Sequence, residues 1–122
     1  MDEPNTIDEW ITEFRRCVVA QNEAIAKGDP ETGNRLAHRY IDAANNLIRT
    51  GNTGLAAFEL LLGDSAVDVR TMAAAFLIPY KTAESKCVLE NSAMGWGTVA
   101  LGARIALRRW ETERKGIDIG HL

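Results

Sequence analysis

The sequence predicts an all-α fold of about six helices in three hairpins, and three observations favour it. Alanine is the commonest residue, with seventeen copies, and leucine follows with eleven, whereas proline occurs only three times. Alanine and leucine favour helix, and the β-branched residues are dispersed rather than alternating as in a strand. Apolar residues recur every three or four positions between glycines, which is the period of a half-buried helix.

The first helix is expected from about Ile7 to Lys27. Thr6 and Glu9 have the spacing of a capping box, in which the hydroxyl and the carboxylate satisfy each other's backbone amides. Gly28 follows as a C-terminal stop. One stripe with a single polar interruption marks the inward face: Ile7, Trp10, Ile11, Phe14, Val18, Gln21 and Ile25.

The second helix is expected from Pro30 to about Thr50. Asp29 is the N-cap, and Pro30 takes the first helical position, where its missing N–H is not needed. Gly51 ends the helix. Because the linker to the first helix is short, the two should pack as an antiparallel hairpin. The inward stripe is Leu36, Ala37, Tyr40, Ala44, Leu47 and Ile48.

A short third helix is expected over Gly54–Leu62 and a fourth over Ala66–Ile78. Asp64 or Ser65 is expected to cap the fourth helix, and Pro79 to stop or kink it. The expected inward residues are Leu55, Phe58, Leu61 and Leu62 on the third helix, and Val69, Met72, Ala73, Phe76 and Leu77 on the fourth.

A fifth helix is expected over Lys81–Ser92, before the glycine-rich break Met94-Gly95-Trp96-Gly97. Trp96 is expected to be a hinge aromatic that packs into the core. The apolar residues of this helix are Ala83, Cys87, Val88 and Leu89.

The last helix is expected over Thr98–Lys115, with Gly116 ending it, so that residues 1–116 form one domain and 117–122 a loose tail. Its first half is apolar nearly all round apart from Arg104, which suggests a central position. The inward residues are Val99, Ala103, Ala106, Leu107 and Trp110.

The segment Leu60–Leu77 resembles a HEAT-repeat hairpin. In that family a leucine-rich helix meets a short turn containing Asp, followed by a Val-Arg pair and a helix of small residues. Asp64 would turn the chain, Val69 would anchor the seam, and Arg70 would bond the carboxylates of the turn or a neighbouring repeat. Three alanines, 73–75, would let two helices approach closely.

The whole chain is also similar to a bacterial family of small domains of unknown function with an armadillo/HEAT-like fold. The shared features are a long first hairpin, the pattern Leu-Leu-x-x-Asp…Val-Arg…Ala-Ala, a Pro with a short helix, and a Gly-rich turn before an Ala-rich helix. Here the last two are Gly95-Trp96-Gly97 and the helix that carries Trp110. The resemblance implies a right-handed superhelix and no established activity.

Composition weighs against several classes of function. The net charge is −3, without the basic excess of a nucleic-acid binder. No apolar run is long enough to cross a bilayer, and the acidic start lacks a signal pattern, so we expect a cytoplasmic protein and no membrane partner. Cys17 and Cys87 are expected to be small buried residues. No metal-ligand or cofactor spacing is present, so we expect no cofactor.

Few residues qualify as a functional site. His38 and Asp42 lie four apart on the second helix and can pair, either as an exposed pair or as a catalytic dyad, although no partner for catalysis is evident. Arg70 is structural unless it points into an open groove. The last helix is rich in bases, among them Arg104, Arg108 and Arg109, whereas the start of the chain is acidic. Matching of the helix dipoles explains most of this polarity, but it could also orient a partner or a second copy.

The leading hypothesis is a protein-interaction module without catalysis, in an adaptor or immunity-like role, with an unidentified protein partner or a second copy of the chain. The alternatives are a nucleic-acid-processing or other enzyme on a HEAT-like scaffold, and a small-ligand binder with a pocket lined by Trp96, Trp110 and Tyr40. The expected interaction surface comprises His38, Asp42, Arg70, Arg104, Arg108 and Arg109.

Overall fold

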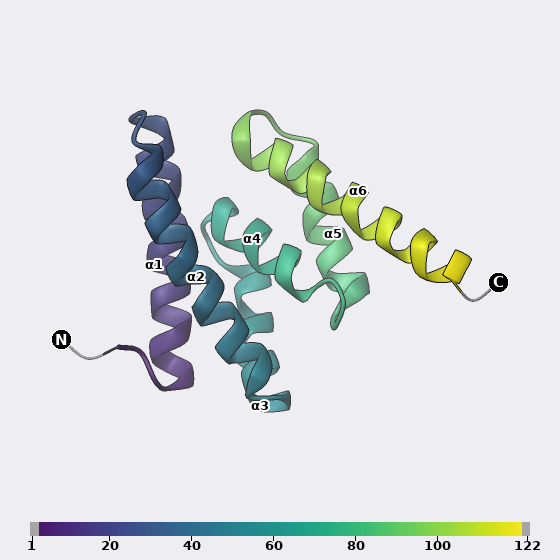
Figure 1. Ribbon diagram of the computed structural model, residues 1–122, viewed down its shortest axis with the longest axis horizontal. Helices are drawn as coiled ribbons and strands as arrows, with labels where there is room; N and C mark the ends of the chain where they lie inside the picture. The colour runs from purple at the N-terminus through teal and green to yellow at the C-terminus, as the bar shows by residue number, and fades with distance from the viewer. Residues whose placement is uncertain (1–2, 121–122) are drawn as a thin grey trace.

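The structure, a computed structural model, describes the backbone of residues 3–120 and the side chains of residues 3–113. Within that range the chain is all-helical, without a strand (Figure 1). The elements are α1 (Ile7–Ala26), α2 (Pro30–Arg49), α3 (Asn52–Glu59), the 3₁₀ turn η1 (Leu60–Gly63), α4 (Val67–Leu77), α5 (Thr82–Ala93) and α6 (Gly97–Gly120). No helix within residues 3–120 combines the length and apolar character that a membrane span requires.

The expected caps of the first two helices are confirmed. The backbone N–H of Glu9 donates to Thr6 Oγ1 at 3.2 Å, and the Thr6 hydroxyl donates to Glu9 Oε1 at 2.9 Å. At the start of α2, the N–H of Thr32 donates to Asp29 Oδ1 at 3.2 Å. Gly28 follows α1 with a φ of 76°, a left-handed conformation that favours glycine. Local chemistry therefore sets the start of α1 and the turn between α1 and α2.

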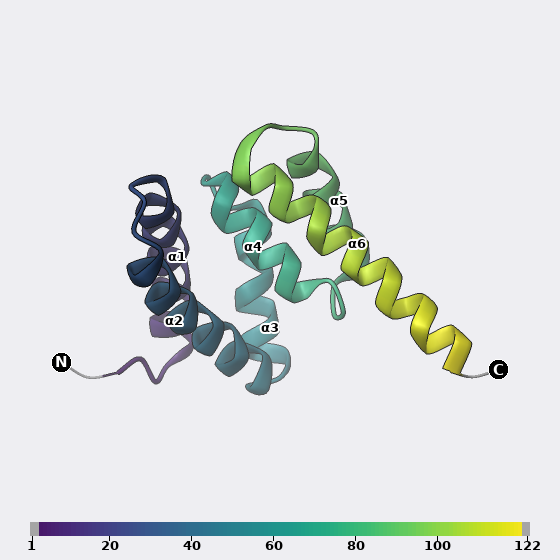
Figure 2. The ribbon, with the colours of Figure 1, turned by 45° about the horizontal axis from the view of Figure 1, so that its top comes forward.

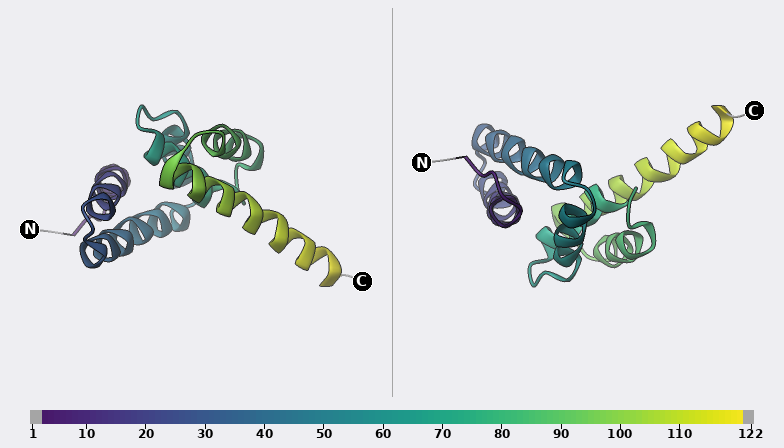
Figure 3. Two further views of the ribbon diagram at one scale, coloured as in Figure 1. Left: turned by 90° about the horizontal axis from the view of Figure 1, so that it is seen from above. Right: turned by 90° about the horizontal axis from the view of Figure 1, so that it is seen from below.

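The helices are arranged in two groups, joined by α4. In Figure 1 and Figure 2, α1 and α2 lie side by side at the N-terminal end of the molecule, and α5 and α6 form the other end. Figure 3 shows that the C-terminal part of α6 extends beyond the remaining helices. The last helix is therefore at the edge of the molecule, and the central position expected for it is wrong.

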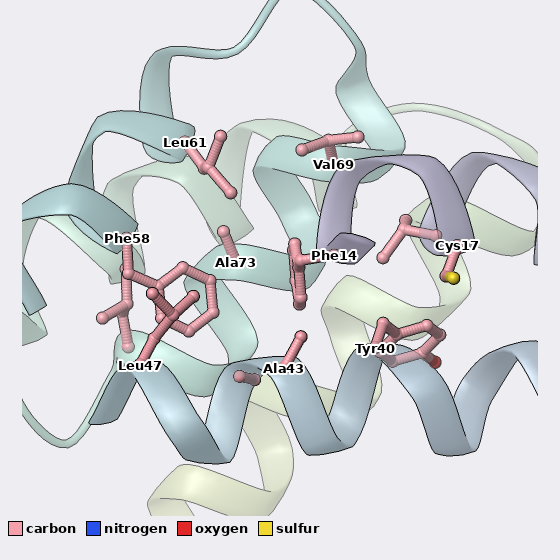
Figure 4. Packing of buried hydrophobic residues seen from close by; sticks show 12 residues of the cluster. Phe14, Cys17, Tyr40, Ala43, Leu47, Phe58, Leu61, Val69 and Ala73 are labelled. Atoms are coloured by element: carbon pink, nitrogen blue, oxygen red, sulfur yellow. The ribbon is translucent and has the colours of Figure 1, made fainter. Parts of the chain in front are cut away.

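The larger core is centred on Phe14 of α1 (Figure 4). Its ring makes edge-to-face contacts with Tyr40 of α2, Phe58 of α3 and Phe76 of α4, with centroid distances of 5.8, 5.0 and 6.0 Å. Such pairs add about 0.5–1.5 kcal/mol each beyond the burial of their area. The inward stripes expected on the second, third and fourth helices all contribute to this cluster, which confirms them.

A second, smaller core joins α4 to the last two helices. Its buried members are Ala74 and Ile78 of α4, Leu89 of α5 and Ala103 of α6. Because Ala73 of α4 belongs to the first core and Ala74 to the second, the small side chains of α4 lie between the two groups. The small alanine side chains therefore let other helices pack against two faces of α4.

Three helix boundaries differ from expectation. The third helix tightens into η1 over its last turn, and α4 begins at Val67 without a side-chain cap. Asp64 instead accepts a bond from the N–H of Ala66 at 3.0 Å, within the turn. The helix α6 passes through Gly116, because glycine inside a helix costs only about 1 kcal/mol relative to alanine. The domain division at residue 116 stays a prediction, and residues 121–122 lie outside the described range.

Three expectations about burial are wrong. Ile25, expected on the inward stripe of the first helix, is 47% exposed near the end of α1. Trp96 is 95% exposed, because it lies in the turn beyond the end of α5 rather than over a core. On α5 the fully buried residues are Ser85 and Leu89, whereas Cys87 is exposed. The other thiol, Cys17, is buried in the first core as expected, and this burial raises its pKa, which disfavours the thiolate form.

Gly54 permits α3 to pack against the end of α2. A Cβ placed on Gly54 would lie 1.9 Å from the carbonyl oxygen of Leu47 and 3.0 Å from the Cβ of Thr50. The carbonyl group of Leu47 belongs to the backbone, so it cannot move aside as the end of a flexible side chain can. Only glycine fits this position without displacement of one helix.

We predict that Gly54→Ala destabilises the protein by about 2 kcal/mol or more, because overpacking displaces backbone. The matched control is Gly102→Ala, in α6, where an added Cβ meets nothing within 4 Å and helix propensity should increase stability by about 0.5–1 kcal/mol. Urea unfolding measures both. Equal stabilities for the two variants would contradict the close approach of α2 and α3.

Candidate functional site

The face of α6 that points away from the molecule carries two large apolar side chains. Ala100 and Ala103 are 2% and 0% exposed on the packed side. At about 100° per residue, Leu101, Ile105 and Arg108 lie on the opposite side, and Leu101 and Ile105 are 53% and 51% exposed. We call this surface the outer face of α6 and define it by Leu101, Arg104, Ile105, Arg108, Arg109 and Thr112.

The turn before α6 adds two more exposed apolar residues. Met94 is 82% exposed and Trp96 is 95% exposed. The guanidinium of Arg104 donates from Nη2 to the carbonyl of Gly95 at 3.2 Å, which ties this turn to the first turns of α6. Large exposed apolar residues next to arginine are typical of protein interfaces, where tryptophan, methionine and arginine are enriched.

The outer face of α6 is hollowed. Its side chains, together with Glu113, line an open hollow of about 610 Å³ on this one helix. The arginines that border the hollow are all exposed. A small-molecule site normally encloses most of its ligand, so this surface is better suited to an elongated partner that lies along the helix.

Two charges of the outer face have no protein partner in the described structure. Among the side chains of residues 3–113, none forms an ion pair or hydrogen bond with Arg108 or Arg109. Both guanidinium groups are exposed. They are therefore available to a carboxylate brought by another molecule.

The other expected site residues lie elsewhere. His38 and Asp42 are both exposed on α2, and within the described side chains no bond joins them. The ligand pocket expected between Trp96, Trp110 and Tyr40 is wrong. Tyr40 is buried in the first core, Trp110 packs on the second, and Trp96 is exposed. Within residues 3–113, no three His, Cys, Asp or Glu side chains gather as metal ligands would.

Arg70 has a structural position. Its Nη1 donates to the carbonyls of Asp64 and Ser65, at 2.8 and 3.2 Å, and thereby closes the turn before α4. The salt bridge expected inside the repeat is wrong. The carboxylate of Asp64 instead accepts two bonds from Arg15 of α1, Nε to Oδ1 at 2.7 Å and Nη2 to Oδ2 at 3.3 Å. The motif predicted the acid, but its partner is 49 residues away.

A second bond joins the first turn of α4 to α1. The side-chain amide of Asn22 donates to Asp68 Oδ2 at 3.1 Å. The hydrogen bond from Arg15 is the main cause that lowers the pKa of Asp64, with the N–H of Ala66 adding to it. This group of residues therefore positions α4 against α1 and is structural rather than functional.

We predict that Asp64→Ala destabilises the protein by about 1–2 kcal/mol, because it loses both the ion pair and the bond to Ala66. Asp64→Asn keeps an acceptor for Ala66 and should cost less, about 0.5–1 kcal/mol. A double-mutant cycle with Arg15→Gln, measured by urea unfolding, isolates the pair. If the changes in unfolding free energy from the Asp64 and Arg15 substitutions add fully in the double variant, a direct interaction is contradicted.

The same variants give a pH signature. Because Arg15 lowers the pKa of folded Asp64, the stabilisation is present above the unfolded-state pKa of about 3.9 and is lost as the pH falls through the folded-state value. The difference in unfolding free energy between the wild type and Asp64→Asn should stay level from about pH 5 to 8 and shrink below about pH 4. A difference that grows in acid would contradict the assignment.

Comparison with known proteins adds a fold and no activity. No known protein family matches the chain, and no curated protein matches it. Among solved structures, the chain is similar to the protein RPA1889 from Rhodopseudomonas palustris, with a TM-score of 0.80 at 20% identity, over 88% of this chain and 89% of that one. At this identity the likeness extends to the all-helical fold alone, shared with a bacterial protein.

Proposed function

We propose that the protein is a helical interaction module that binds another protein through the outer face of α6 and performs no catalysis itself. The observation that carries the proposal is the exposure of Leu101 and Ile105, 53% and 51%, on the side of α6 opposite its packed face. An adaptor or immunity-like role in the cytoplasm is the form of this function that we favour.

The proposal includes a right-handed armadillo/HEAT-like arrangement of three hairpins. It is supported by the motif of Leu60–Leu77 and by the way in which α4 contributes to both cores. In such stacks each hairpin completes its core against a neighbour, and a terminal hairpin requires a polar outer side. Leu101 and Ile105 place an apolar ridge on the otherwise polar outer side of α6, so a further helix packed there would complete the stack.

The alternatives find less support. A nucleic-acid enzyme on this scaffold needs an extended basic surface, but the chain has a net charge of −3 and the bases of α6 alternate with Leu101 and Ile105. A small-ligand binder needs an enclosed pocket, whereas the hollow on α6 is open.

The test is site-specific photocrosslinking in the cells that make the protein. A benzophenone amino acid replaces Ile105 in one variant and Asn52 in a control, since Asn52 is exposed at the start of α3. We expect a discrete adduct from position 105 that is absent from position 52. The adduct should disappear when Leu101→Ser is added, because the apolar contact is lost.

Adducts of equal strength from both positions, or none from position 105, would overturn the proposal. Binding to duplex DNA at low salt is the second arm. Tight binding that falls steeply with added salt would favour a nucleic-acid function instead.

A further inference from the structure

We propose that the partner presents an acidic amphipathic helix, which lies along the outer face of α6 with its apolar side chains between Leu101 and Ile105 and its carboxylates on Arg108 and Arg109. This inference rests on the proposed function and adds the chemistry of the partner. The shape and the charge of the face support it, as does the poor fit of a second copy of the chain to the same face.

The shape of the face suits a helix. Leu101 and Ile105 are four residues apart, so they form one ridge along α6. Helices pack by placing the ridges of one into the grooves of the other, at axial distances of about 8–10 Å. The open hollow of about 610 Å³ beside this ridge accepts apolar side chains of a facing helix.

The charge of the face selects an acidic partner. Arg108 continues the line of Leu101 and Ile105, while Arg104 and Arg109 lie on its two sides. Arg104 is already bonded to Gly95, which leaves Arg108 and Arg109 as the guanidinium groups of the outer face without a bond to a described side chain. Carboxylates that flank an apolar stripe would meet them in bidentate geometry.

A second copy of the chain fits this face poorly. If two α6 helices paired antiparallel about the middle of Leu101–Thr112, Ile105 would face Arg108, and Arg104 would face Arg109. Like charges opposite each other oppose such pairing. The carboxylates that a second copy has to offer these arginines are the acids at the start of its α1. These acids are partly engaged within the chain, because Glu9 bonds to Thr6 and Glu13 pairs with Arg16.

An anionic membrane surface fits less well than a helix. Helices that lie in a membrane interface bury a broad apolar face with basic residues beside it. On α6 the apolar side chains of the outer face are Leu101 and Ile105, and the next residue along their line is the charged Arg108. The narrow ridge and its hollow match a facing helix in shape more closely than a plane.

The experiment uses the full chain and two synthetic helical peptides as probes. Both carry leucine at every third or fourth position, and they differ only in the residues beside the leucines, glutamate in one and lysine in the other. We expect the glutamate peptide to bind at least about tenfold more tightly by fluorescence anisotropy. Its affinity should fall as salt rises from about 0.05 to 0.5 M, because the charges are exposed.

A charge-reversed variant supplies the decisive control. In Arg108→Glu/Arg109→Glu the preference should invert, so that the lysine peptide binds more tightly. The matched variant Arg35→Glu/Arg39→Glu reverses two exposed bases of α2 and should leave both affinities unchanged. Circular dichroism confirms that each variant keeps its helical content.

The possible failures are distinguishable. If both peptides bind equally well, and both lose their affinity in Leu101→Ser/Ile105→Ser, the claim that the partner is acidic is overturned. The proposed function then still stands. If neither peptide binds, the inference also fails, and the photocrosslink at position 105 still decides the function. Cosedimentation with vesicles of phosphatidylcholine and phosphatidylserine, abolished by Arg108→Glu/Arg109→Glu, would replace the helix by a membrane. Dimers in sedimentation velocity, abolished by Leu101→Ser/Ile105→Ser, would replace it by a second copy.

Discussion

The contact of Phe14 with three other rings is the interaction on which the rest of the structure depends. Each of α2, α3 and α4 contributes one aromatic residue, and all three meet the fully buried ring of Phe14 edge to face. A chain with only 7% aromatic residues thus gathers four of them at the point where four helices converge. Truncation of such a residue typically costs about 3–5 kcal/mol.

This arrangement explains why the two ends of the molecule differ. Four helices share the aromatic core, and α1 adds polar bonds from Arg15 to the turn before α4 and from Asn22 to the first turn of α4. The last two helices are held by a smaller core against α4. The helix α6 therefore packs on one side only, and its outer face is left open to another molecule.

Much of the fold could be predicted from sequence because the signals are local. Thr6 with Glu9, and Asp29 with Pro30, fix helix starts through atoms only a few residues apart. The strong periodicity of α2 also identified its buried face. The predictions fail where contact with a distant part of the chain decides whether a side chain is buried. Cys87 and Trp96 are apolar in type, but α4 packs on another side of α5, and the turn leaves Trp96 95% exposed.

The candidate site was only partly predictable. The bases Arg104, Arg108 and Arg109 were found from charge alone, and the expected inward residues Ala103, Leu107 and Trp110 of the last helix do pack on the second core. The sequence did not show that Leu101 and Ile105, on the opposite side, would be left exposed by the packing of the other helices. Likewise, the partner of Asp64 is Arg15, far away in the chain, for which the motif holds no signal.

Hydrogen exchange with mass spectrometry tests most directly whether the Phe14 core holds the molecule together. The comparison is Phe14→Leu against Leu89→Ala, a truncation in the second core. Because the last two helices depend on α4, Phe14→Leu should speed amide exchange in all six helices. Leu89→Ala should speed it in α5 and α6 while α1–α3 keep their protection. Loss of protection in α1 and α2 equal to that in α5 and α6, in Leu89→Ala, would contradict the account.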